Sequence, residues 1–165
     1  NMLRDGLRLR AIGDLSGLPI YAQEIVHEAV KATEHNDSHN LTLALNYGSR
    51  QETIYAIKSY AEKVARGQTD HHKLDWKTFA SHLYTADLPD PDLIIRTSGE
   101  YRLSNFLLLQ AAYAEIHVTP VPWPEFGREE FLSALEDYNH RERRFGQTGE
   151  QVQHITGSTG KTISA

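Results

Sequence analysis

The segment Asp92-Leu93-Ile94-Ile95-Arg96-Thr97 decides the fold. Its run of large apolar residues is short, and Gly99 follows it, which is typical of a strand buried on both faces. Pro89 and Pro91 disfavour a helix immediately upstream. Strands buried in this way belong to parallel sheets that are covered by helices. The segment therefore predicts an α/β protein.

Strand and helix patterns alternate on both sides of this segment. The predicted strands span 7–13, 41–48, 92–97 and 116–119, and the predicted helices span 19–34, 50–65, 76–83, 104–114 and 129–143. We therefore expect an open, mostly parallel sheet with flanking helices. In such sheets ligands bind at the carboxyl ends of the strands.

Length and composition narrow the class of protein. With 165 residues, the chain is predicted to form a single domain over residues 1–146, and the polar residues 147–165 are predicted to be a disordered tail. The net charge of −5 disfavours a general nucleic-acid binder, and the absence of cysteine excludes disulfides and thiolate chemistry. Because no stretch reaches the roughly 20 apolar residues of a membrane span, any membrane contact is expected to be peripheral.

The densest polar cluster runs from Arg96 to Ser104. It leads from the carboxyl end of the predicted strand to the start of the predicted helix 104–114, and it brings two guanidinium groups, several hydroxyls and helix N-terminal N–H groups together. Such a set suits a phosphate or diphosphate. The alternative is a capped helix in which Arg96 pairs with Glu100 and Ser104 is the N-cap. The local pattern leaves both interpretations open.

The predicted helix 104–114 is apolar on nearly every face, so we expect the core or another subunit to cover it. Glu115 follows it. A carboxylate at a helix C-terminus is unfavourable for the helix dipole, so a metal or cationic partner stands beside the alternative of a solvated acid. At 1.5 Å per residue, Glu115 would lie roughly 16 Å from Ser104 along the helix. The two residues therefore address different sites, unless a second subunit brings one of them across.

Three further motifs have a local structural explanation beside a functional one. The basic run 141–146 either ends a helix, with Gly146 as its cap, or adds a second group that binds an anion. The glycine-rich segment 157–162 lacks the glycine that a phosphate loop requires at position 155. The pair His71-His72, beside Asp70, is predicted to lie in a solvated loop, because adjacent residues rarely bind one metal together.

The longest motif resembles a known family signature. The sequence Asp92-Leu-Ile-Ile-Arg96-Thr-Ser-Gly-Glu100-Tyr-Arg102-Leu-Ser104-Asn-Phe-Leu-Leu-Leu-Gln110-Ala-Ala-Tyr-Ala-Glu115, followed by Trp123-Pro-Glu-Phe126, resembles that of the undecaprenyl diphosphate synthase family of cis-prenyltransferases. The segments 7–14, 45–50 and 141–146 resemble other blocks of the family in the same order. The resemblance implies the family's α/β fold, truncated at the N-terminus.

Members of this family condense isopentenyl diphosphate with an allylic diphosphate, usually farnesyl diphosphate, with magnesium. The resemblance implies that the residues which bind the substrate diphosphate are Arg96, Arg102, Leu103, Ser104, Arg144 and Gly146. It also implies that Glu115 is a ligand of Mg²⁺. The aspartate loop of the family is expected upstream of Asn1, so no catalytic residue is assigned within the chain, which is expected to be inactive alone.

The resemblance further implies partners and a location. Family members form homodimers or heterodimers, which suits an all-apolar segment, and a homodimer is expected here. The expected role is isoprenoid synthesis for cell-wall biosynthesis, in the cytoplasm with peripheral membrane contact through the lipid product. The alternative is a non-catalytic partner subunit of a heterodimeric cis-prenyltransferase. A nucleotide-binding switch is a third interpretation, and it rests only on the defective glycine motif.

Overall fold

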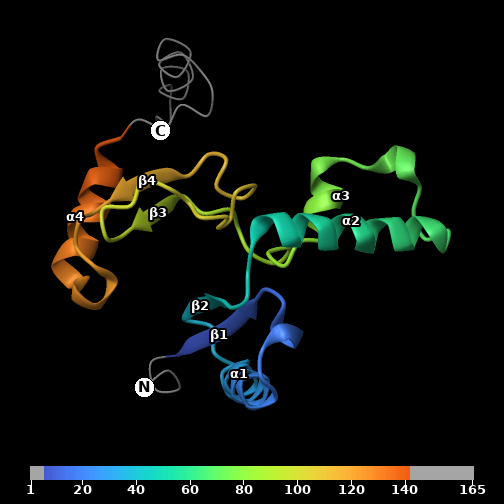
Figure 1. The fold of residues 1–165 in the computed structure, drawn as a ribbon, viewed down its shortest axis with the longest axis horizontal. Helices are drawn as coiled ribbons and strands as arrows, with labels where there is room; N and C mark the ends of the chain where they lie inside the picture. Colours follow the sequence, from blue (N-terminus) through green and yellow to red (C-terminus); the bar gives the residue numbers. More distant parts are fainter. Residues whose placement is uncertain (1–5, 142–165) are drawn as a thin grey trace, which may run out of the picture. The chain divides into compact units, whose positions relative to one another are not determined.

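The computed structural model describes residues 6–141, which fall into two compact units. Unit 1 comprises residues 6–90 and 103–109, and unit 2 comprises residues 91–102 and 110–141. The boundary therefore crosses the chain inside the polar cluster, between Arg102 and Leu103. Figure 1 shows the elements of both units along the chain.

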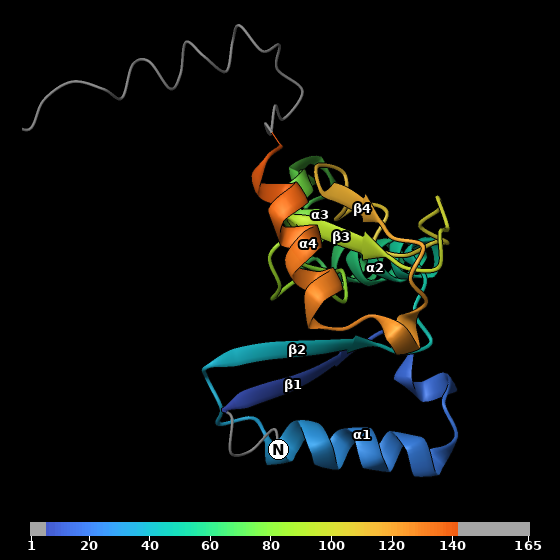
Figure 2. The same cartoon turned by 90° about the vertical axis from the view of Figure 1, so that its left-hand side faces the viewer.

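Unit 1 begins with a β-α-β arrangement. The elements of this unit are β1 (Leu7–Ile12), η1 (Leu15–Gly17), α1 (Ile20–Ala32), β2 (His39–Ala44), α2 (Ser49–Ala65), η2 (His71–Lys73) and α3 (Trp76–Ala80). Strands β1 and β2 pair in parallel, with Leu9 opposite Leu41. Figure 2 shows α1 alongside this pair. Because parallel neighbours need a crossover connection, α1 takes that place as the sequence pattern predicts.

A side chain from the end of α1 supplies a hydrogen-bond acceptor for the backbone of β1. The buried Thr33 hydroxyl accepts a hydrogen bond from the backbone N–H of Leu9 at 2.9 Å. After β1 the chain turns at Gly13, whose φ is 111°. A Cβ at this position would collide with the backbone oxygen of Leu45, so only glycine fits the turn. The turn fixes the exit of β1 against the segment that follows β2.

Unit 2 also contains a pair of parallel strands, which are shorter than those of unit 1. It contains β3 (Leu93–Arg96), β4 (Glu115–Val118), η3 (Trp123–Glu125) and α4 (Arg128–Asn139). Strands β3 and β4 pair in parallel, with Leu93 opposite Glu115 and Arg96 opposite Val118. Figure 1 shows α4 beside β4, and the buried core of this unit includes Ile94 and Ala134.

The expected fold class is confirmed, since both strand pairs are parallel and helices flank them. Each pair lies within its own unit. The predicted division into residues 1–146 and a disordered tail at 147–165 stays a prediction, because its boundary lies outside the described residues. No helix among residues 6–141 is long and apolar enough to cross a membrane.

The helix predicted over residues 104–114 is wrong. This stretch consists of consecutive turns, and Ser104, Asn105 and Leu107 have φ angles of 49°, 62° and 45°. A right-handed helix requires negative φ at every position. The segment is apolar, as its sequence shows, but its backbone forms hydrogen bonds with α2 instead of the hydrogen bonds of a helix. These contacts are described below.

Candidate functional site

Arg96 lies at the carboxyl end of β3, where the sequence placed it. Its backbone oxygen accepts a hydrogen bond from Thr119 N at 2.9 Å, which extends the β3–β4 pairing by one residue. The chain then turns through Ser98 and Gly99, both with φ of 65°. Gly99 N donates back to Thr119 O at 2.9 Å, so the turn is fixed against the exit of β4.

The guanidinium of Arg96 contains a buried donor without an acceptor. Within the described residues, its Nε atom is buried and has no hydrogen-bond partner. Leaving a buried polar donor unpaired is unfavourable by about 1–3 kcal/mol, and more when the group is charged. An anion that supplied an acceptor oxygen at this position would remove that penalty.

Arg102 is the second arginine of the polar cluster 96–104, and it belongs to the same unit as Arg96. It forms an ion pair with Glu100 across the turn, and 66% of its side chain is exposed. The sequence alternative paired Glu100 with Arg96, and that pairing is wrong because Glu100 is engaged by Arg102 instead. An exposed ion pair contributes little to stability, so Arg102 can exchange its carboxylate for another anion at low cost.

Leu103 and Ser104 belong to unit 1, whereas Arg96 and Arg102 belong to unit 2. Ser104 is in a left-handed turn conformation, so it is not the N-cap of a helix and no helix N-terminus follows it. Both interpretations that placed a helix start at this position are therefore corrected. Arg144 and Gly146 lie outside the described residues.

The segment 103–109 is bound to the first turn of α2. The backbone oxygen of Asn105 accepts from Ser49 N at 2.8 Å, and its side-chain Oδ1 accepts from Arg50 N at 3.0 Å. Leu108 N in turn donates to the buried Ser49 Oγ at 2.7 Å. The first N–H groups of a helix lack partners within the helix. Asn105 supplies acceptor oxygens for two of these groups, although it lies 55 residues from Arg50 in the sequence.

A buried carboxylate lies beside this contact, and sequence reasoning missed it. Glu52 is fully buried in α2 and accepts hydrogen bonds from Tyr47 Oη at 2.6 Å and Tyr84 N at 2.9 Å. Burial, followed by the hydrogen bond to Glu52, raises the pKa of Tyr47 above its usual range. A glutamate in the first helical turn is ordinarily an exposed dipole partner, so composition and periodicity gave no signal of this role.

Glu115 is the first residue of β4 and forms an ion pair with Arg141. Arg141 Nη1 lies 3.0 Å from Glu115 Oε2, and its Nη2 lies 2.7 Å from Asp137 Oδ2. The same Asp137 oxygen is 2.7 Å from His117 Nδ1. Arg141, and to a smaller extent His117, lower the pKa of Asp137 through these hydrogen bonds. The four-residue spacing between Asp137, on α4, and Arg141, just beyond the end of α4, was the available sequence signal for this network.

The strand register separates Glu115 from Arg96. Glu115 is opposite the first residue of β3, whereas Arg96 is its last. Three residues of strand correspond to roughly 10 Å. The separation of about 16 Å between Glu115 and Ser104 along a helix, which the sequence predicts, is wrong because that helix is absent. Within unit 2, the register places Glu115 and Arg96 at opposite ends of the paired strands.

A carboxylate oxygen is the donor type that Mg²⁺ prefers, so Glu115 fits as one ligand of a magnesium ion. Its present partner is a guanidinium, which the cation would have to replace. One carboxylate is not a complete site, since Mg²⁺ takes six ligands. Glu115 therefore fits as one of several ligands of the ion and is not a complete site by itself.

A parallel α/β arrangement with arginines beyond the carboxyl end of a strand is typical of proteins that bind phosphorylated ligands. A family model described as "Putative undecaprenyl diphosphate synthase" matches residues 1–146. The chain belongs to the undecaprenyl diphosphate synthase family, which confirms the resemblance drawn from the sequence.

The chain is similar to named relatives. An isoprenyl transferase of Heliobacterium mobile is 50% identical over 141 residues, a match that covers 86% of this chain and 54% of that protein. The ditrans,polycis-undecaprenyl-diphosphate synthase of Vibrio cholerae, described as specific for (2E,6E)-farnesyl diphosphate, is 45% identical over 152 residues, covering 92% and 61% respectively. The chain thus spans little more than half the length of these curated relatives.

Solved structures agree in fold. Lavandulyl diphosphate synthase from Lavandula x intermedia, in complex with dimethylallyl diphosphate, matches with a TM-score of 0.83 and 37% identity over 88% of this chain and 67% of that chain. A probable undecaprenyl diphosphate synthase from Campylobacter jejuni matches with a TM-score of 0.73 and 36% identity, over 87% of this chain and 65% of that chain.

Proposed function

We propose that this chain is the acceptor-binding part of a cis-prenyltransferase that condenses isopentenyl diphosphate with an allylic diphosphate such as farnesyl diphosphate. Family membership supports the reaction class. The observation that carries the binding role is the buried, unpaired Nε of Arg96 at the carboxyl end of β3. A diphosphate oxygen would complete its hydrogen bonding.

Arg96 and Arg102 would hold the diphosphate of isopentenyl diphosphate. A guanidinium offers two parallel N–H donors to a phosphate and keeps its charge at all physiological pH values. Arg102 would exchange Glu100 for the substrate. Leu103 and Ser104, which the family signature also implies as diphosphate-binding residues, stay predictions from the sequence. Arg144 and Gly146 are proposed to contribute from the C-terminal segment. Held in this way, the acceptor's double bond is presented to the allylic carbon.

Glu115 is proposed as one ligand of Mg²⁺, whose charge would assist departure of the allylic diphosphate. Because the strand register separates Glu115 from Arg96 by roughly 10 Å, these residues would serve different parts of the reacting pair. A homodimer is proposed, with one subunit completing the site of the other. Location in the cytoplasm, with peripheral membrane contact through the product, completes the proposal.

On its own, the 165-residue chain is proposed to bind the acceptor without turning over. It spans 54% and 61% of the two curated relatives described above, so the remainder of those proteins would supply the allylic site. Incubation with radiolabelled isopentenyl diphosphate and farnesyl diphosphate checks this proposal. Incorporation of label into a longer prenyl chain would contradict it.

The binding role is tested by calorimetric titration with isopentenyl diphosphate. Arg102→Ala is expected to weaken binding about tenfold or more, because a charge-assisted pair of hydrogen bonds is lost. Arg66→Ala is the matched control, since Arg66 is also an exposed arginine (68%) paired with a glutamate, Glu62. Equal affinities for the Arg102 variant and the wild-type chain would refute the assignment.

A further inference from the structure

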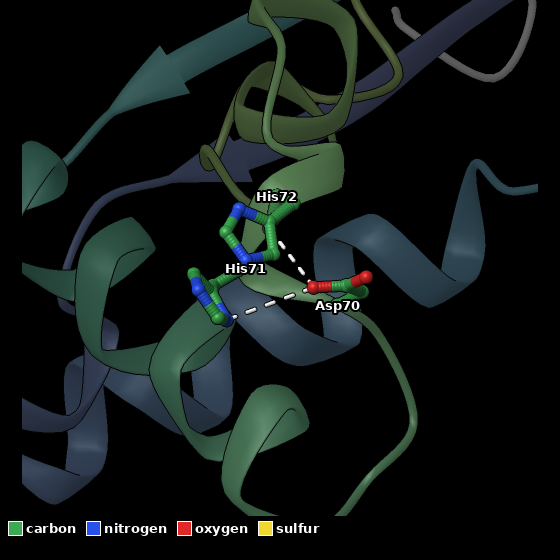
Figure 3. Close-up of side chains that lie close together, drawn as sticks. All are labelled: Asp70, His71 and His72. Atoms are coloured by element: carbon green, nitrogen blue, oxygen red, sulfur yellow. Dashed lines mark hydrogen bonds and ion pairs between the residues drawn. The ribbon is translucent and has the colours of Figure 1, made fainter.

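A group of three donor side chains lies on the loop between α2 and α3, and the proposed function does not use it. Asp70, His71 and His72 each offer one ligand atom, and these atoms all lie within 4.8 Å of one another. Figure 3 shows the two imidazole rings side by side next to the carboxylate. We propose that these three residues bind one divalent transition-metal ion, such as Zn²⁺ or Ni²⁺.

The separations are close to those of a formed site. Asp70 Oδ1 lies 3.6 Å from His71 Nδ1, and the centroids of the two rings are 3.9 Å apart. In a tetrahedral site with bonds of about 2.1 Å, neighbouring ligand atoms are roughly 3.4 Å apart. Since all three ligand atoms lie within 4.8 Å of one another, no pair has to close by more than about 1.4 Å, and rotation of exposed imidazoles between allowed orientations covers such a shift.

Local backbone geometry answers the objection that adjacent residues seldom share a metal. In a strand, adjacent side chains point to opposite faces. His71 and His72 instead lie in the 3₁₀ turn η2, where successive side chains are separated by about one third of a turn. This turn brings both rings to the side of the loop that carries the carboxylate of Asp70.

The loop is held in place without the metal. Tyr60, a buried residue of α2, donates its hydroxyl hydrogen to the backbone oxygen of Asp70 at 2.8 Å. Asp70 Oδ1 accepts from His72 N at 3.0 Å and thereby caps η2. Two of the three donor residues are thus fixed relative to each other and to α2, which lowers the entropy lost on binding.

The donor set selects the class of ion. Two imidazole nitrogens and one carboxylate oxygen suit Zn²⁺, Ni²⁺, Co²⁺ and Cu²⁺, whereas Mg²⁺ and Ca²⁺ prefer sites built from oxygen. All three side chains are exposed, so water can occupy the remaining coordination positions. The ion would hold the side chains of these three consecutive residues together, within the connection between α2 and α3.

The test is calorimetric titration of the tag-free 165-residue chain with Ni²⁺ and, separately, with Zn²⁺. A saturable site is expected, and the double substitution His71→Asn with His72→Asn should weaken it at least about tenfold. His35→Gln is the matched control, because His35 is also an exposed histidine (90%) next to a carboxylate, that of Glu34, at 3.3 Å. It should leave the affinity unchanged, and a hundredfold excess of Mg²⁺ should not compete.

A second measurement on the unsubstituted chain guards against misfolding of the variant. Substoichiometric Ni²⁺ should broaden the imidazole NMR signals of His71 and His72 before those of His35. Wild-type affinity in the double variant, equal loss in the His35 variant, or broadening that begins elsewhere would each overturn the proposal. None of these outcomes depends on prenyl transfer, so failure here leaves the proposed function untouched.

Discussion

Asn105 should govern the stability of the first turn of α2, although it is 55 residues away in sequence. Replacing it by alanine removes the acceptor of Arg50 N, a loss of about 1 kcal/mol. It also forces alanine into the left-handed conformation, with φ of 62°, which is unfavourable by about 1 kcal/mol or more. Asn105→Ala should therefore lower the local unfolding free energy by about 2 kcal/mol.

Amide hydrogen exchange resolved at Ser49 and Arg50 measures this effect. A loss of about 2 kcal/mol corresponds to exchange that is about 30-fold faster. Asn105→Asp is the control, because aspartate keeps the acceptor, tolerates positive φ and suits the positive end of the helix dipole. Exchange in the alanine variant within threefold of the wild type, or equal acceleration in both variants, would refute the capping role.

Two further predictions concern buried ionisable groups. Glu52→Ala removes the acceptor of Tyr47 and Tyr84, and should lower the free energy of unfolding in urea by about 3 kcal/mol. The control is Glu62→Ala at an exposed position, which should change this free energy by less than about 0.5 kcal/mol. Similar losses in both variants would contradict the prediction. Burial lowers the pKa of His82 in the folded chain, so the stability it contributes is present above the unfolded pKa of about 6.5 and is lost as pH falls below it. Thermal unfolding at pH 7 and pH 5 should show a smaller pH dependence in His82→Gln, and an unchanged dependence would count against the assignment.

The sequence predicted the strands because their signals are local. The run of apolar residues before Arg96 is bounded by Pro91 and Gly99, and β3 lies within it. The helix over 104–114 failed for a physical reason that no local pattern reveals. Its hydrophobicity is high, but Asn105 takes a left-handed conformation to satisfy N–H groups of α2. A tertiary hydrogen bond therefore overrode the helical pattern.

The position of Arg96 was predicted from the sequence, whereas the ion pair of Glu115 was not. Arg96 is where the pattern placed it, at the end of a parallel strand. The partner of Glu115 was missed, because Arg141 is 26 residues away and the basic run at this helix end has an adequate local explanation. Pairings of this kind depend on the packing of α4 against β4, which composition and spacing do not specify.

The central claim is that the carboxyl end of β3 binds the diphosphate of isopentenyl diphosphate. Its most direct test is the ¹H–¹⁵N NMR spectrum of the arginine Nε–Hε groups during titration with isopentenyl diphosphate. We expect the Arg96 signal to shift strongly, since its buried Nε gains an acceptor, and the Arg102 signal to shift as well, while the Arg66 signal stays in place. Saturating ligand that leaves the Arg96 signal unmoved, or that moves Arg66 equally, would contradict it.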